Sequence, residues 1–171
     1  GDGNIDTGVT SSIASPASHT YSASGIYTVN VSGGLTQVNY DNIDARDKLK
    51  LTDISQWGNI AWLDFTSGFM GCSNFELTAT DAPDLSNVNS TREMLSGANS
   101  FNTSINHWDM GNVNNVYRMF LGATSFDQNI SSWDITSFND MRQFLTSAGI
   151  STTNYDALLI GWEATLQAAY P

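Results

Sequence analysis

Three aspartates recur along this chain at a constant spacing of 25 residues: Asp84, Asp109 and Asp134. Each stands between apolar positions of a short extended segment, so the carboxylates are expected to point outward from one face. Parallel strands lie about 4.8 Å apart, and like charges at that distance destabilise unless something compensates. A row of Ca²⁺ ions or polar ligands is one compensation. A local Asx turn, in which each carboxylate accepts hydrogen bonds from following N–H groups, is the favoured one.

A second set of oxygen ligands stands near the amino terminus. Asp2, Asn4 and Asp6 have the i, i+2, i+4 spacing of a calcium loop. Thr7 replaces the turn glycine of such a loop, and Ile13 stands where its closing glutamate belongs. A hairpin turn is therefore favoured over a Ca²⁺ site.

Enzymatic constellations are scarce. His19 and His107 are the two histidines, and His107 occupies the position that Ser132 holds one repeat later. A zinc site needs clustered ligands and a nucleophile needs a paired base, and neither pattern accompanies these histidines. We therefore expect a protein that is not an enzyme and has no cofactor. The candidates for a binding face are Asp84, His107, Asp109, Ser132 and Asp134.

The same spacing of 25 runs through the apolar residues. The recurring sets are Val88, Val113 and Phe138; Gly97 and Gly122; Phe101 and Phe126; Ile105 and Ile130; Trp108 and Trp133. A period of this size predicts one supersecondary unit per repeat, which buries its apolar side by stacking on its neighbours. Trp108 and Trp133 are accordingly expected between the stacked units. Function is expected on an extended surface.

Each repeat is predicted to hold a short strand and a short helix. The helix is inferred from one apolar stripe, with Asn87, Asn112 and Ser137 as N-caps; the stripe consists of Val113, Val116, Met119, Phe120 and Ala123. The strands are expected at 105–110 and 130–135, which fit the L-x-x-L-x-L spacing of leucine-rich repeats. Such units stack in a right-handed coil with parallel strands on one face.

The two ends read differently from the middle. Residues 1–40 are predicted to form strands, because 25–31 alternate in polarity between glycine-rich turns. They are either part of a β-sandwich or an N-terminal cap on the solenoid. Residues 41–150 are predicted to form the solenoid, with Leu49, Leu51 and Ile54 at its first strand edge. Residues 151–171 are predicted to form a capping helix that starts with a Thr153–Asp156 capping box and has an apolar face of Leu158, Leu159, Trp162 and Leu166.

Composition narrows the class of protein. Six basic residues stand against 17 acidic ones, for a net charge of −11, which repels nucleic acid. Only 13% of residues are charged, so Asn, Ser, Thr and Gly must form much of the surface, as in secreted or cell-surface proteins. No apolar run reaches the roughly 18 residues that span a bilayer, and no signal pattern opens the chain, which looks like a cut from a larger protein. Cys72 aligns with Ala98 and reads as a buried packing thiol.

Two resemblances follow from these motifs. The segment from Met119 through Trp133 to Ile135 resembles the repeat of BspA-like leucine-rich repeat proteins, M-F-x-x-A-x-x-F-N-x-x-I-x-x-W-D, and the likeness covers about 49–162. Pro83 replaces the tryptophan in the first unit. Residues 1–31 are similar to the carboxyl half of a PKD-type β-sandwich, through Gly1-Asp2-Gly3, His19-Thr20-Tyr21 and the 25–31 strand. Such proteins are mostly modular and displayed on bacterial surfaces, which implies roles in adhesion or interaction.

The sequence therefore predicts an α/β protein: a leucine-rich-repeat-like, right-handed solenoid with an N-terminal β segment and a C-terminal capping helix. The predicted function is non-catalytic binding of a protein or glycan outside the cell or at its surface, by a monomer without membrane insertion. The alternative is a structural spacer in a larger extracellular protein. A binder should present an aromatic or charged cluster on one face, whereas a spacer needs only solubility.

Overall fold

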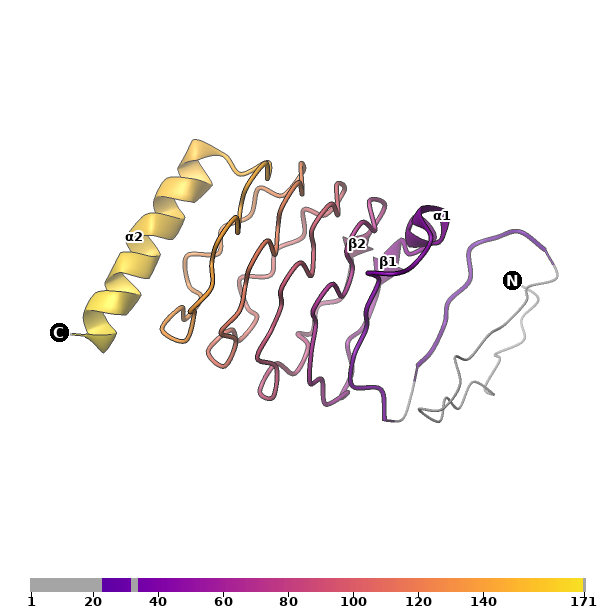
Figure 1. The fold of residues 1–171 in the computed structure, drawn as a ribbon, viewed down its shortest axis with the longest axis horizontal. Coiled ribbons are helices and arrows are strands. Elements are labelled where there is room, and N and C mark those ends of the chain that lie inside the picture. Colours follow the sequence, from indigo (N-terminus) through magenta and orange to yellow (C-terminus); the bar gives the residue numbers. More distant parts are fainter. Residues whose placement is uncertain (1–22, 32–33, 171) are drawn as a thin grey trace.

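The computed structural model describes residues 23–31 and 34–170, in which the chain winds through successive turns that lie side by side along the long axis (Figure 1). We call these turns coils and number them by the repeat. Coil 1 holds residues 61–85, coil 2 holds 86–110, coil 3 holds 111–135 and coil 4 holds 136–150. Helix α2, Thr152–Ala169, lies across the end of the stack that follows coil 4.

One segment of each coil is built as a hydrogen-bonded ladder. These ladder segments are residues 65–72, 91–98, 116–123 and 141–148. In 116–123, alternate N–H groups donate across to the next coil, as from Val116 to the Asp140 carbonyl at 3.0 Å and from Arg118 to the Arg142 carbonyl at 3.1 Å. The N–H groups between them donate back three residues, as from Met119 to the Val116 carbonyl at 3.1 Å. Each junction between ladder segments thus has four cross-coil bonds, at 2.7–3.1 Å.

The α-helix predicted in each repeat is therefore wrong for the ladder segments. Their residues form overlapping turns in which positive φ recurs, at 55° for Arg118 and 69° for Gly122, and an α-helix excludes such angles. Asn87, Asn112 and Ser137 accordingly cap no helix. The five residues of the predicted stripe are nevertheless all buried, because turns that advance about three residues place apolar side chains inward nearly as a helix does.

Regular strands are very short among the described residues, and the strands predicted at 105–110 and 130–135 are absent, because turns and bends occupy these residues. Strand β1, Asp53–Ile54, pairs in parallel with β2, Glu76–Leu77, and isolated parallel bridges join other coils, as between Asn115 and Asp140. Helix α1, Ala45–Lys48, precedes β1. Residues 25–31 form no strand, contrary to the sequence prediction, and their apolar side chains stay exposed, Ile26 at 92% and Val29 at 62%.

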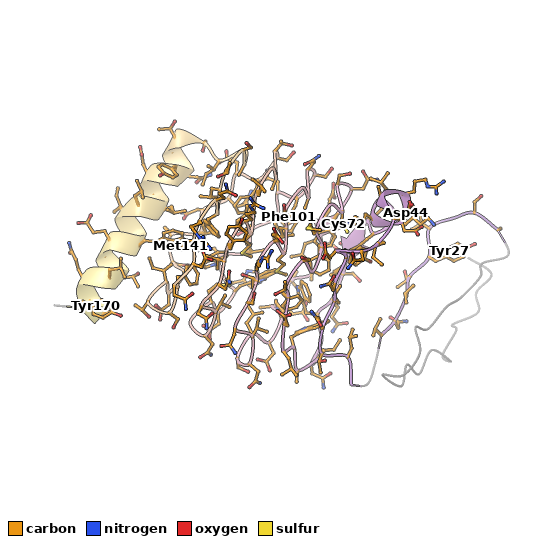
Figure 2. The ribbon with its side chains drawn as sticks, viewed as in Figure 1. Tyr27, Asp44, Cys72, Phe101, Met141 and Tyr170 are labelled. Atoms are coloured by element: carbon orange, nitrogen blue, oxygen red, sulfur yellow. The ribbon has the colours of Figure 1, made fainter. Side chains whose placement is uncertain are left out.

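Aromatic side chains fill the interior of the stack. Phe75, Phe101 and Phe126 stack in a column with ring centroids 5.7 and 6.1 Å apart. Cys72 and Phe101 both lie in the interior of the coil stack (Figure 2). The prediction that Trp108 and Trp133 are buried is confirmed, and the Trp133 indole N–H donates to the Ile105 carbonyl of coil 2 at 3.1 Å. Cys72 is also fully buried, and burial raises the pKa of its thiol to about 11.

Helix α2 covers the last coil with two buried side chains, Leu158 and Trp162. The Trp162 indole N–H donates to the Ile130 carbonyl at 3.2 Å, which extends the Trp133 arrangement by one layer. The N-cap is Ser151, whose hydroxyl accepts from the Asn154 N–H, so the predicted Thr153–Asp156 box is wrong. Leu159 and Leu166 are exposed, which narrows the predicted apolar face. No helix in the described part of the chain is long and apolar enough to cross a membrane.

Candidate functional site

The aspartate column predicted as a candidate site forms local turns. Asp84, Asp109 and Asp134 each accept a hydrogen bond from the N–H two residues on, at 3.0, 3.1 and 2.9 Å. Asp134 also accepts from the Thr136 hydroxyl at 2.7 Å, and these bonds hold the pKa of its carboxyl below the usual range. The geometry is that of the Asx turn. Within 23–31 and 34–170, no three His, Cys, Asp or Glu side chains are grouped to hold a metal ion.

The other predicted residues do not join the aspartates in one constellation. Ser132 donates to Asn106 in coil 2, at 2.6 Å to its side-chain oxygen and 3.1 Å to its carbonyl, so its hydroxyl takes part in stacking. His107 is exposed, and its charge is a minor cause of the lowered pKa of Asp81, whose carboxylate mainly accepts the Trp57 N–H. The calcium candidates Asp2, Asn4 and Asp6 lie outside the described residues.

The structure assembles a different cluster, which we call the arginine cluster: Arg92, Tyr117, Arg118 and Arg142. The guanidinium carbons of the three arginines lie 5.5, 4.7 and 5.3 Å from the centre of the Tyr117 ring. A cation within about 6 Å of an aromatic face is attracted by its quadrupole. The chain has only six basic residues, so half of them surround this one tyrosine on three successive coils.

Backbone geometry places the cluster on the corners of turns. The first turn of each ladder segment closes with a hydrogen bond back three residues, as from Met94 to Thr91 and from Met119 to Val116. Its two corner positions form two columns at the repeat spacing. One column is Arg92, Tyr117 and Arg142, and the other is Glu93, Arg118 and Gln143. In the first of these columns Arg92 and Arg142 are exposed and Tyr117 is partly exposed.

Acidic and amide groups fix the arginines in place. Glu93 pairs with Arg92 at 3.3 Å and with Arg118 at 3.6 Å, and Arg118 Nε also donates to the Gln143 side chain. Asp140 receives two hydrogen bonds from Arg142, at 2.9 and 2.8 Å. The side-chain hydrogen bond lowers the pKa of Asp140 and raises the pKa of Arg142. With its paired carboxylates, Glu93 and Asp140, the arginine cluster has a formal charge of +1.

Sequence reasoning missed the arginine cluster although its spacing was visible. The search for columns relied on the same residue type recurring every 25 positions, as for Asp84, Asp109 and Asp134. In the cluster the type changes from Arg to Tyr to Arg, and from Glu to Arg to Gln. Alignment by position alone would have grouped all six residues.

Comparison with known proteins places this chain in one family. Residues 38–158 match the model of a family described as Mycoplasma protein of unknown function, DUF285. Searches of curated proteins and of solved structures found no match. The family match spans coils 1–4, including the ladder segments and the arginine cluster. Because it covers more than half of the 171 residues, the chain belongs to the family of Mycoplasma proteins of unknown function, DUF285.

Proposed function

We propose that this chain is a non-catalytic binding module that recognises a protein or glycan outside the cell or at its surface. The observation that carries the proposal is the arginine cluster, in which three cations surround one aromatic ring and two of them, Arg92 and Arg142, are exposed. Arg and Tyr are enriched among the residues that dominate binding energy at interfaces. A spacer needs no such cluster, since solubility is already supplied by 17 acidic residues.

Long polar side chains at left-handed corners support this proposal. Glu93, Arg118 and Gln143 hold φ values of 55°, 55° and 58°, a region that costs a residue other than glycine roughly 1–3 kcal/mol. Glycine would adopt this conformation freely. Ser67 and Ser147 hold the same angles outside the cluster, so the cluster is distinguished by the long polar side chains at these corners and not by the angle itself.

The finer class of the fold is also a proposal. We infer that the coils form a right-handed, leucine-rich-repeat-like solenoid of the BspA-like kind. The parallel bridges about one repeat apart, Ser90 to Asn115 and Asn115 to Asp140, support a repetitive stack. Surface display rests on the resemblance and on the neutral polar composition.

A binding screen tests the proposed function. The described protein would be applied to a glycan array and to a panel of extracellular host proteins, beside a variant with Arg92, Arg118 and Arg142 all changed to Gln. We expect at least one ligand that binds to the unsubstituted protein and does not bind to the variant. Binding of no ligand in either format would contradict the proposal and favour a structural spacer.

A further inference from the structure

We infer that the arginine cluster binds the single carboxylate of an acidic sugar, such as a sialic or uronic acid unit. This inference rests on the proposed binding function and specifies its ligand. Three features of the described residues carry it: the hydrogen-bond donors that the cluster leaves unused, its net charge, and the absence of exposed large apolar side chains on the coils that carry it.

The first feature is the set of unused donors. Intramolecular partners take Arg142 Nε and Nη2, Arg118 Nε and Nη1, and Arg92 Nη2. Arg92 Nε and Nη1, Arg118 Nη2 and Arg142 Nη1 have no acceptor among the described residues. A guanidinium matches a carboxylate with two parallel N–H···O bonds. The unused Nε and Nη1 of Arg92 lie on opposite sides of its guanidinium, so each can donate one charge-assisted hydrogen bond. Because every arginine of the cluster keeps an unused donor, a carboxylate at the cluster can accept from more than one of them.

The second feature is charge. With its paired carboxylates, the cluster carries a formal charge of +1, so one further carboxylate neutralises it, whereas the whole chain carries −11. A densely charged ligand would meet repulsion from the remaining acidic surface within about a Debye length. This balance favours a ligand with isolated negative charges over a heavily sulfated chain or a nucleic acid.

The third feature is the distribution of exposed apolar side chains, which favours a sugar over a protein as the ligand. On the coils that carry the cluster, residues 86–150, no large apolar side chain is exposed. The exposed Leu63 belongs to the adjacent coil 1, two residues before Phe65, which donates to the Ser90 carbonyl. The core of a protein–protein interface is usually apolar and water-excluding. Near the cluster the chain offers polar groups such as Ser90 and Asn115, which suit a hydroxyl-rich ligand.

Titration of ¹⁵N-labelled protein with the methyl glycoside of N-acetylneuraminic acid, and separately with methyl glucuronide, tests the inference. We expect amide shifts at Arg92, Tyr117, Arg118 and Arg142 for at least one of the two. R118Q should weaken binding about tenfold, as expected for loss of a charge-assisted contact. The chain already places Gln143 in the same column at the same φ, so Gln is compatible with this fold. R46Q is the matched control, because it changes net charge equally at an exposed arginine outside the cluster, and binding should change less than about twofold.

Four outcomes would overturn the inference. They are equal binding of the neutral methyl ester of the sugar, equal binding by R118Q, tighter binding of heparin, and tighter binding of an acidic peptide. If neither acidic sugar binds while another ligand emerges from the array or the protein panel, the inference fails and the binding function stands. If nothing binds in any format, both fail. Unchanged circular dichroism and melting temperature would show that R118Q keeps its fold.

Discussion

Each ladder segment has two turns, and both close with a hydrogen bond back three residues and have a left-handed residue just before the donor. The two turns differ in the type of residue at that left-handed corner. In the second turn this corner is glycine in coils 1–3, at Gly71, Gly97 and Gly122, with φ between 69° and 76°. In the first turn it is Glu93, Arg118 or Gln143 in coils 2–4. The second turn therefore follows the usual preference for glycine, and the first turn departs from it in each of these coils.

This difference shows that the backbone of the turns stacks the coils, whereas the corner side chains are available for another role. Both turns send N–H groups to the next coil at similar distances, 3.1 Å for Arg118 and 2.9 Å for Gly122. The cross-coil bonds thus do not depend on the side chain at the corner. The first turn holds the arginine cluster, so the side chains there are free to serve binding while the backbone holds the coils together.

Removing the core under both turns should have the largest effect. Phe120 lies between the two corners, is fully buried, and stacks on Phe126 with centroids 4.0 Å apart. Phe120→Ala should lower the free energy of unfolding by about 3–5 kcal/mol, as in other buried aromatic truncations. Urea denaturation followed by Trp fluorescence measures the change, and a loss under about 1 kcal/mol would show that the turns stand without this support.

Placing a side chain at the glycine corner should cost less. Gly122→Ala should lower the free energy of unfolding by about 1 kcal/mol, because a left-handed conformation is unfavourable for alanine. A Cβ there has no atom within 4 Å, so the cost is conformational and not steric. Gly34→Ala is the control: its surroundings are equally open and its φ is outside the left-handed region. Equal unfolding curves for the two variants would contradict the comparison.

One second turn has serine in place of glycine at its left-handed corner, and replacing this serine should stabilise the protein. Ser147 holds φ at 58° in coil 4, where the preceding coils have glycine. Ser147→Gly should raise the free energy of unfolding by about 0.5–1 kcal/mol, since relief of strain exceeds the added freedom of the unfolded chain. Differential scanning calorimetry should show a higher melting temperature. A lower one would mean that the Ser147 side chain makes a stabilising contact.

Glycine at the first corner should abolish binding of the acidic sugar while changing the free energy of unfolding very little. Arg118→Gly relieves the same strain but removes the contacts with Tyr117, Glu93 and Gln143, each worth up to about 1 kcal/mol near the surface. The net change in unfolding free energy should stay within about 0.5 kcal/mol, while acidic-sugar binding is lost in the amide titration. A destabilisation above about 1 kcal/mol would make Arg118 chiefly a structural residue.

The smallest expected effect is on the pH dependence of the melting temperature. The pKa of Asp140 is lowered in the folded state by Arg142, so its contribution to stability is present above the unfolded pKa of about 3.9 and is lost as pH falls through the folded value. Asp140→Asn should therefore show a slightly shallower fall of melting temperature between about pH 5 and pH 3. Parallel curves would indicate that the Arg142 pair adds nothing to stability.

The sequence predicted burial better than local conformation. The period of 25 located the buried tryptophans and the inward residues from Val113 to Ala123, because stacking forces apolar positions to recur. It could not distinguish a helix from overlapping turns, since both advance about three residues between inward positions. Gly97 and Gly122 were the visible sign of left-handed corners, whereas Glu93 and Arg118 gave none, because charged residues seldom adopt positive φ.

The candidate site was predicted only in part. The Asx geometry of Asp84, Asp109 and Asp134 followed from a local rule that holds wherever Asp opens a turn. The arginine cluster needed knowledge of which corner side chains converge on Tyr117, and that depends on the lateral packing of three coils. The resemblance to surface repeats gave the expectation of binding without naming these residues.

The four main-chain bonds at each junction bear on how such a chain can lengthen. A duplicated block of 25 residues brings its own backbone N–H and C=O groups for the cross-coil bonds. It can therefore insert between existing coils without new side-chain partners. Each added block would also bring two new corner positions beside the old ones. Growth by duplication would thus extend the row of display positions, and point substitution could then alter what that row recognises.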